Sequence, residues 1–145
     1  MKKAFFLLFI IFIYSCQTNK TNTTSILPYK TADHYFVKND QINEFVEKVI
    51  TSQVEFNQFF GEAAFMGKSG KPTPIDFSKE NVIALIHPKT DKAVEISPVK
   101  LETIQTGETI YHYQVKVGEK RSFDVIPKLI IVVHKNVEKI TFKKE

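Results

Sequence analysis

Apolar and polar residues divide the chain into an apolar N-terminal run, a polar segment and a longer region with strand-like patterns. Residues 4–14 (AFFLLFIIFIY) are apolar without interruption and follow the basic Met1-Lys2-Lys3. Residues 17–25 (QTNKTNTTS) contain no aliphatic or aromatic side chain. Such a segment cannot bury enough apolar surface to fold alone. We therefore expect the folded part of the chain to be one β-rich globular domain over residues 31–145.

Most periodic segments of this domain have the pattern of β-strands. Between Tyr111 and Val117, apolar residues alternate strictly with His112, Gln114 and Lys116, which is typical of a half-buried strand. The runs 82–86 (VIALI) and 129–133 (LIIVV) are continuously apolar and predict strands buried on both faces. Shorter strand candidates lie at 34–38, 93–96, 99–103 and 140–142, and Thr106-Gly107-Glu108 predicts a hairpin turn.

One helix is predicted over residues 52–61. Ser52 and Glu55 have the spacing of a capping box, in which each side chain accepts a hydrogen bond from a backbone N–H at the start of the helix. Phe56 and Phe59-Phe60 then form an apolar face, and Gly61 is a plausible stop. Residues 41–50 fit both a helical stripe and a strand. Because the start signal comes only at Ser52, we expect a strand before the helix.

These elements predict an α+β fold, namely a mainly antiparallel sheet or a small barrel-like sandwich of about five to seven strands with one helix. About 110–120 residues remain for this fold, which is the usual size of a single domain. The lysine-rich end of the chain suits an edge strand, where charge discourages pairing with another sheet.

The N-terminus has the features of an export signal. The apolar run of eleven residues is too short to span a bilayer. A basic start followed by an apolar run of this length is typical of a signal peptide. The run ends at Ile13-Tyr14-Ser15-Cys16, which resembles the lipobox of bacterial lipoproteins. We therefore predict a signal peptide over 1–15, lipidation of Cys16 and a flexible tether over 16–30.

The cysteine count agrees with an acylation site. Cys16 is the only cysteine, so no intramolecular disulfide can form. Two or three acyl chains would anchor the protein stably in a membrane. No acidic run follows Cys16, and by analogy with Bacteroides-type lipoproteins this favours an outer-membrane anchor that faces the periplasm. The predicted location is thus the bacterial cell envelope.

Charge and motifs argue against nucleic-acid and nucleotide partners. The chain has 20 Lys and Arg against 16 Asp and Glu, and two of the lysines belong to the signal. This balance lacks the clustered basic charge of a nucleic-acid-binding domain. Gly67-Lys68-Ser69 resembles the end of a phosphate-binding loop, but Glu62 stands where that motif needs its first glycine.

No pattern indicates an enzyme, a metal site or a cofactor. The histidines lie far apart in sequence, and no second cysteine could complete a metal site. The nucleophile motif G-x-S-x-G is absent from the sequence. We therefore expect a non-catalytic protein without cofactor, and we expect the histidines to be ordinary surface or hydrogen-bonded residues. They are His34, His87, His112 and His134.

Several short motifs resemble a known family of lipoproteins. The motifs that carry the resemblance occur in a fixed order along the chain. They are Glu55-Phe56 with Phe59-Phe60, then Ile75-Asp76-Phe77-Ser78-Lys79, then Val82-Ile83-Ala84, and finally Pro127 before the last long apolar run. This order, over residues 46–134, resembles the C-terminal domain of PrcB, a lipoprotein subunit of a bacterial surface protease complex. The chain resembles uncharacterised Bacteroides-type lipoproteins still more closely, because they carry the same short motifs in the same order: Phe60-Gly61, Met66-Gly67, Pro72-Thr73 and Ile75-Asp76-Phe77.

The resemblance implies a non-catalytic envelope lipoprotein that binds another protein. One departure is the segment Lys89-Thr90-Asp91-Lys92-Ala93, which has no glycine where the PrcB-type domain has a Gly-Gly-Tyr-like turn. The candidate partner-binding surface is the loop 61–74, with Phe65, Met66, Lys68 and Ser69 as contact residues. Phe65 and Met66 could equally fill the core. The alternatives are a loop-based protease inhibitor and a small-molecule or saccharide carrier with a pocket in the sheet.

Overall fold

The computed structural model describes residues 24–38, 42–63 and 70–145. These residues form ten strands and one helix. In chain order they are β1 (Ser25–Ile26), β2 (Lys30–Thr31), β3 (Tyr35–Val37), β4 (Val46–Ile50), α1 (Gln53–Phe59), β5 (Phe60–Glu62), β6 (Glu80–Ile86), β7 (Thr90–Thr103), β8 (Thr109–Val125), β9 (Lys128–His134) and β10 (Ile140–Lys144).

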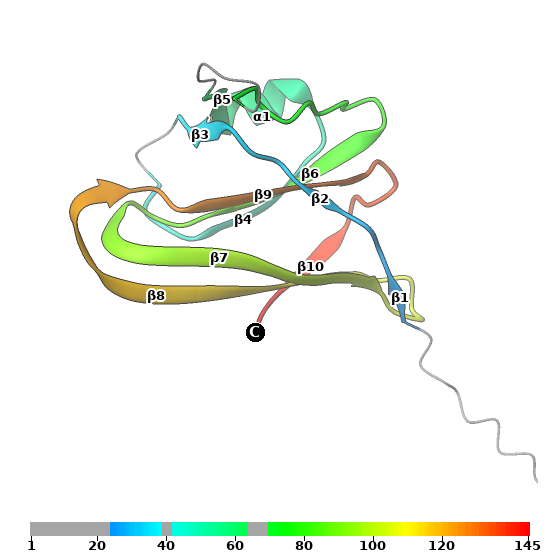
Figure 1. Cartoon of the computed structure of the whole chain (residues 1–145). Coiled ribbons are helices and arrows are strands. Elements are labelled where there is room, and N and C mark those ends of the chain that lie inside the picture. The colour runs from blue at the N-terminus through cyan, green and yellow to red at the C-terminus, as the bar shows by residue number, and fades with distance from the viewer. Residues whose placement is uncertain (1–23, 39–41, 64–69) are drawn as a thin grey trace, which may run out of the picture.

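The strands form three sheets that stack in layers (Figure 1). Sheet A has the order β1-β7-β8-β10, and sheet B has the order β2-β9-β6-β4. The short ladder β3-β5 lies with α1 on the face of sheet B that is turned away from sheet A (Figure 1). Sheet B is therefore the central layer, which explains why its two middle strands are almost entirely apolar.

A single long hairpin connects sheets A and B. At its open end, β6 pairs antiparallel with β9, and Glu80 lies opposite His134. At its closed end, β7 pairs antiparallel with β8, and Thr103 lies opposite Thr109. Between these two ladders the N–H of His87 donates to the carbonyl of Pro127 at 2.8 Å. The hairpin bends at this point, so its closed half lies in sheet A and its open half lies in sheet B.

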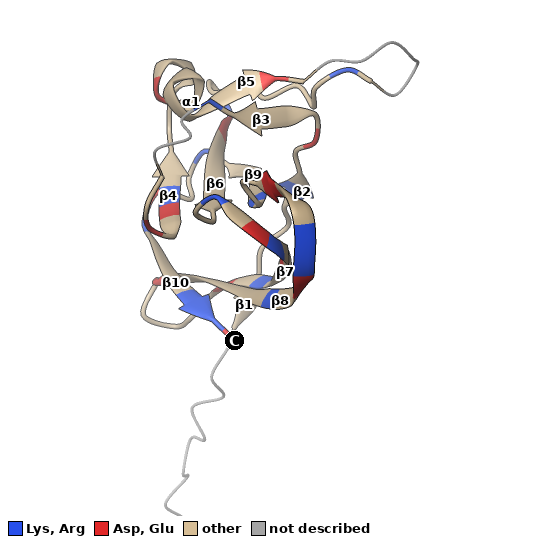
Figure 2. Ribbon diagram, turned by 90° about the vertical axis from the view of Figure 1, so that its left-hand side faces the viewer, with Lys and Arg blue, Asp and Glu red and all other residues tan. Residues whose placement is uncertain are grey.

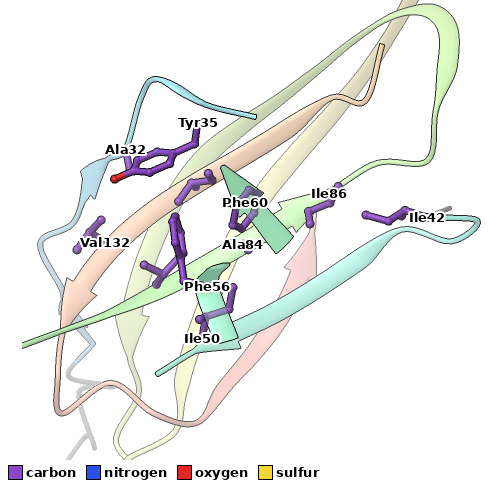
Figure 3. Close-up of a cluster of buried hydrophobic side chains, with 11 residues drawn as sticks. Ala32, Tyr35, Ile42, Ile50, Phe56, Phe60, Ala84, Ile86 and Val132 are labelled. Atoms are coloured by element: carbon purple, nitrogen blue, oxygen red, sulfur yellow. The ribbon is translucent and has the colours of Figure 1, made fainter. Parts of the chain in front are cut away.

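The two faces of sheet B pack against different neighbours. Val82, Ala84 and Ile86 of β6 contribute to a cluster with α1 and β5, which Figure 3 shows around Phe56 and Phe60. The alternate residues Ile83 and Leu85 belong to a second cluster, with the inner side chains of sheet A. The prediction that 82–86 and 129–133 are strands buried on both faces is confirmed.

Helix α1 begins as predicted but ends two residues earlier. The Ser52 hydroxyl accepts from the N–H of Glu55 at 3.3 Å, whereas the Glu55 carboxylate accepts from the N–H of Thr51 rather than from that of Ser52. Gly61 stands one residue beyond the C-cap, Phe60, as predicted, but it does not adopt the left-handed conformation of a helix-ending glycine. Phe60 is already extended, and Gly61 lies in β5 opposite Phe36. A Cβ atom on Gly61 would lie 2.5 Å from the Phe36 ring, so a larger residue there would have to displace that ring.

The predicted fold class is confirmed, with more strands than expected. Six strands have five or more residues, and the additional ones are two or three residues long. The two expected strands at 93–96 and 99–103 are one strand, β7, with a register shift between Pro98 and Lys100. β10 lies at the edge of sheet A as expected, but it pairs with β8 in parallel.

Residues 24–30, which the sequence analysis assigned to the tether, contribute to the fold. β1 pairs with the end of β7, and Leu27 and Tyr29 pack against the cluster between sheets A and B. The apolar residues from Ile26 onwards explain this, because they cover an edge of the sandwich.

Removing the Tyr111 hydroxyl is expected to stabilise the protein. The Tyr111 side chain is fully buried between sheets A and B, and among the described residues its hydroxyl has no hydrogen-bond partner. An unpaired buried hydroxyl costs about 1–3 kcal/mol of desolvation. We expect Tyr111→Phe to raise the free energy of unfolding by about 1 kcal/mol in urea titrations. A lower value would show that the hydroxyl makes a hydrogen bond in solution.

Candidate functional site

A groove of about 700 Å³ lies between α1, the β3-β5 ladder and the segment 71–75. Its floor is formed by Tyr35, Phe56 and Phe60, whose rings belong to the cluster drawn in Figure 3. Its rim carries polar side chains of both charges. The rim residues are Lys38, Gln53, Asn57, Glu62 and Lys71.

Hydrogen bonds between distant segments fix the walls of the groove. The Tyr35 hydroxyl donates to the carbonyl of Thr73 at 2.6 Å, and the N–H of Asp33 donates to the Thr73 hydroxyl at 3.0 Å. On the opposite wall, the Lys38 ammonium donates to the carbonyl of Asn57 at 2.9 Å. The segment 71–75 and the helix are thereby both tied to the chain around β3.

The polar groups of the groove can form hydrogen bonds with a ligand. Burial and the nearby Glu62 carboxylate raise the pKa of Tyr35, so its hydroxyl stays protonated and acts as a hydrogen-bond donor. The Gln53 amide donates to the Asn57 side-chain oxygen at 2.8 Å, which leaves amide groups of both residues at the rim. Amides and charges of both signs can pair with the backbone and side chains of a peptide.

A second polar cluster lies on the outer face of sheet A. The imidazole of His112 lies between two carboxylates: Nε2 is 2.9 Å from Glu102 Oε1, and Nδ1 is 2.5 Å from Glu145 Oε1. Lys100 donates to Glu102 at 2.7 Å. The alternation of residues 111–117 places His112 on the outward side of its strand, but the residue is only 3% exposed because these neighbours cover it.

The geometry of the His112 cluster indicates a structural role. Both ring nitrogens are hydrogen-bonded to carboxylates, so neither is free to form a hydrogen bond with a substrate. The carboxylates contact opposite edges of the ring and do not converge on one point. Within the described residues, no group of three or more His, Cys, Asp or Glu side chains could hold a metal ion.

The His112 cluster is expected to make the protein less stable in acid. Hydrogen bonding from Lys100 lowers the pKa of Glu102, and hydrogen bonding from His112 lowers that of Glu145. Because the folded pKa values lie below the unfolded value of about 4.3, the stabilisation is complete above that pH and is lost as the pH falls through the folded values. Urea titrations measure the free energy of unfolding at pH 5.5 and at pH 3. Between these pH values it should fall more for the wild type than for the double variant Glu102→Gln/Glu145→Gln. Equal losses would contradict this assignment.

The site residues predicted from sequence lie outside the described part of the chain. This applies to the lipidation site Cys16 and to the partner-binding candidates Phe65, Met66, Lys68 and Ser69. The flanks of their loop are described, and Glu62 and Lys71 both line the groove. No local sequence pattern marks Tyr35, Lys38 or Asn57 as site residues, because their proximity depends on how the β3-β5 ladder packs on α1.

In the described ranges, no helix has the length and apolar character needed to cross a membrane. Comparison of the chain with protein-family models, with curated proteins and with solved structures gave no match.

Proposed function

We propose that this protein is a non-catalytic lipoprotein of the bacterial cell envelope, anchored through Cys16, whose domain binds another envelope protein in the groove beside α1. In this proposal the lipid on Cys16 inserts into the outer membrane, and the domain faces the periplasm. The resemblance to the PrcB C-terminal domain supports a protein partner, for example a protease.

The observation that carries the proposal is the position of the groove relative to the start of the fold. β1 belongs to sheet A, whereas the groove lies on the opposite face of sheet B, beyond the central layer (Figure 1). The eight residues from Cys16 to the start of the described chain span at most about 28 Å. A lipid on Cys16 would therefore keep the domain near the membrane through the sheet A side, and the groove lies in a different layer from this attachment point.

The lining of the groove favours a protein over a saccharide. Saccharide carriers usually offer exposed aromatic faces, but Phe56 and Phe60 are only 2% and 1% exposed. The accessible groups are the amides and charges of the rim, which suit an extended peptide segment with its own backbone donors and acceptors. A protease inhibitor acting through the loop 61–74 remains the alternative within the same class of partner.

Site-specific photo-crosslinking in native membranes tests this proposal. A photoreactive residue is placed at Gln53 or Lys71 on the rim of the groove, with Thr141 on β10 as the matched exposed control. We expect the same discrete protein adduct from both rim positions and none from Thr141. Identical adducts from all three positions, or no adduct from the rim, would contradict the proposal. Assaying a captured protease with and without the purified domain separates a supporting role from inhibition.

A further inference from the structure

The outer face of sheet A is turned away from sheet B, and no element of the described ranges covers it (Figure 1). Its side chains alternate with Leu101, Tyr111 and Phe142, which point into the cluster between the two sheets. One row of the outer face crosses all four strands and consists of Ile26, Glu102, Ile110 and Thr141. Figure 2 shows β1, β8 and β10 at one end of the molecule and α1, β3 and β5 at the other.

The chain enters the fold at one end of this row. Ile26 lies on β1, at the edge of sheet A, and its side chain is 63% exposed. Cys16 lies ten residues earlier in the sequence, a span of at most about 35 Å in a fully extended chain. A lipid on Cys16 would keep Ile26 within this distance of the bilayer, so a contact between this edge and lipid would be intramolecular.

We propose that the outer face of sheet A lies on the lipid bilayer, with the row from Ile26 to Thr141 at the boundary between headgroups and acyl chains. This inference rests on the proposed anchor at Cys16. A short flexible linker gives a second contact an effective concentration in about the millimolar range, so even a weak contact becomes occupied. Withdrawal of the exposed Ile26 side chain from water favours the contact.

The charged side chains near this row are paired with one another. Lys100 Nζ lies 2.7 Å from the Glu102 carboxylate, and Lys143 Nζ lies 3.8 Å from that of Glu145. His112 lies between these two carboxylates. The face therefore presents both signs of charge close together, as zwitterionic phospholipid headgroups do. Electrostatically complementary protein interfaces instead juxtapose patches of opposite sign, so the charges favour a lipid surface.

Docking through this face would determine the orientation of the groove beside α1. The groove and the outer face of sheet A lie on opposite sides of sheet B (Figure 2). A domain that rests on the bilayer through sheet A therefore turns the groove away from the membrane, where a partner protein can reach it.

Single tryptophan residues test the contact, because the chain contains no tryptophan of its own. The lipidated full chain is reconstituted into phosphatidylcholine vesicles, with or without phosphatidylcholine brominated near the top of its acyl chains. Bromine quenches only fluorophores close to it. We expect Ile26→Trp and Thr141→Trp to lose most of their fluorescence in the brominated vesicles. Val54→Trp is the matched control on α1, at a position that is 74% exposed, and it should lose none.

The position of Thr141 separates docking from mere closeness to the anchor, since β10 and β1 are opposite edges of sheet A. A second substitution then tests the role of Ile26. Ile26→Asp should abolish the quenching of Thr141→Trp, whereas Val54→Asp should leave it unchanged, and thermal melts verify that each variant is folded.

The outcomes separate this inference from the proposed function. Mass spectrometry of the purified protein shows whether Cys16 carries lipid, and an unlipidated protein would overturn the anchor and the docking together. A lipidated protein in which Thr141→Trp is not quenched, or in which Val54→Trp is quenched equally, would overturn only the docking. Protection of Thr141→Trp from acrylamide without quenching by brominated lipid would assign the face to a protein contact and also overturn the inference.

Discussion

Replacing Phe56 by alanine is expected to lower the free energy of unfolding by about 3–5 kcal/mol. Phe56 is 2% exposed, and its ring lies 5.1 Å from that of Tyr35, 4.9 Å from that of Phe60 and 5.8 Å from that of Phe77. The three neighbouring rings come from β3, β5 and the segment before β6, so no single neighbour can move to fill the space. The cavity would loosen the floor of the groove as well as the packing of α1 on sheet B. Urea titration of purified Phe56→Ala measures the effect.

Val54→Ala is the matched control, because Val54 lies on the same helix and is 74% exposed. The free energy of unfolding of Val54→Ala should stay within about 0.5 kcal/mol of the wild-type value. If both variants lost the same stability, α1 would not be packed on the core as described.

Asn81→Asp is expected to destabilise the fold by a similar amount, about 3–5 kcal/mol near neutral pH. Asn81 is fully buried, and its amide nitrogen donates to the carbonyls of Lys135 and Val137, each at 3.0 Å. An aspartate would direct a carboxylate oxygen at these two carbonyls, without a compensating cation. The thermal midpoint and the urea midpoint should both fall strongly.

Asn57→Asp provides the comparison for Asn81→Asp. Asn57 is exposed, and its side-chain oxygen already accepts from Gln53, a hydrogen bond that a carboxylate retains. Its effect should stay below about 1 kcal/mol. A small effect at Asn81 would mean that the connection between β9 and β10 does not rest on this amide.

The sequence was most informative where local pattern and burial coincide. The runs 82–86 and 129–133 predicted doubly buried strands, and Ser52 with Glu55 predicted the start of α1. Both signals depend on neighbouring residues alone. The segment Asp76-Phe77-Ser78 is likewise held by a local contact: Asp76 accepts from the N–H of Ser78 at 3.0 Å, and Phe77 packs against the cluster around Phe56.

Features that depend on distant segments were not predictable from pattern. One such feature is the bend that divides a single hairpin between sheets A and B, and another is the parallel pairing of β10. Neither produces a periodic pattern of apolar residues in the sequence. The same holds for His112, whose partners Glu102 and Glu145 lie 10 and 33 residues away. Its strand position predicted an exposed side chain, and the carboxylates that cover it come from other parts of sheet A and the C-terminus. The groove is of this kind too, since its walls meet only after β3, α1 and the segment 71–75 have packed.

Metabolic labelling with a fatty-acid analogue tests most directly whether the protein is anchored through Cys16, on which the proposed function depends. Cells expressing the wild type and Cys16→Ser are labelled, fractionated and compared. We expect the wild type to carry the label and to sediment with membranes, and Cys16→Ser to carry none. An unlabelled wild type, or equal labelling of both proteins, would contradict the account.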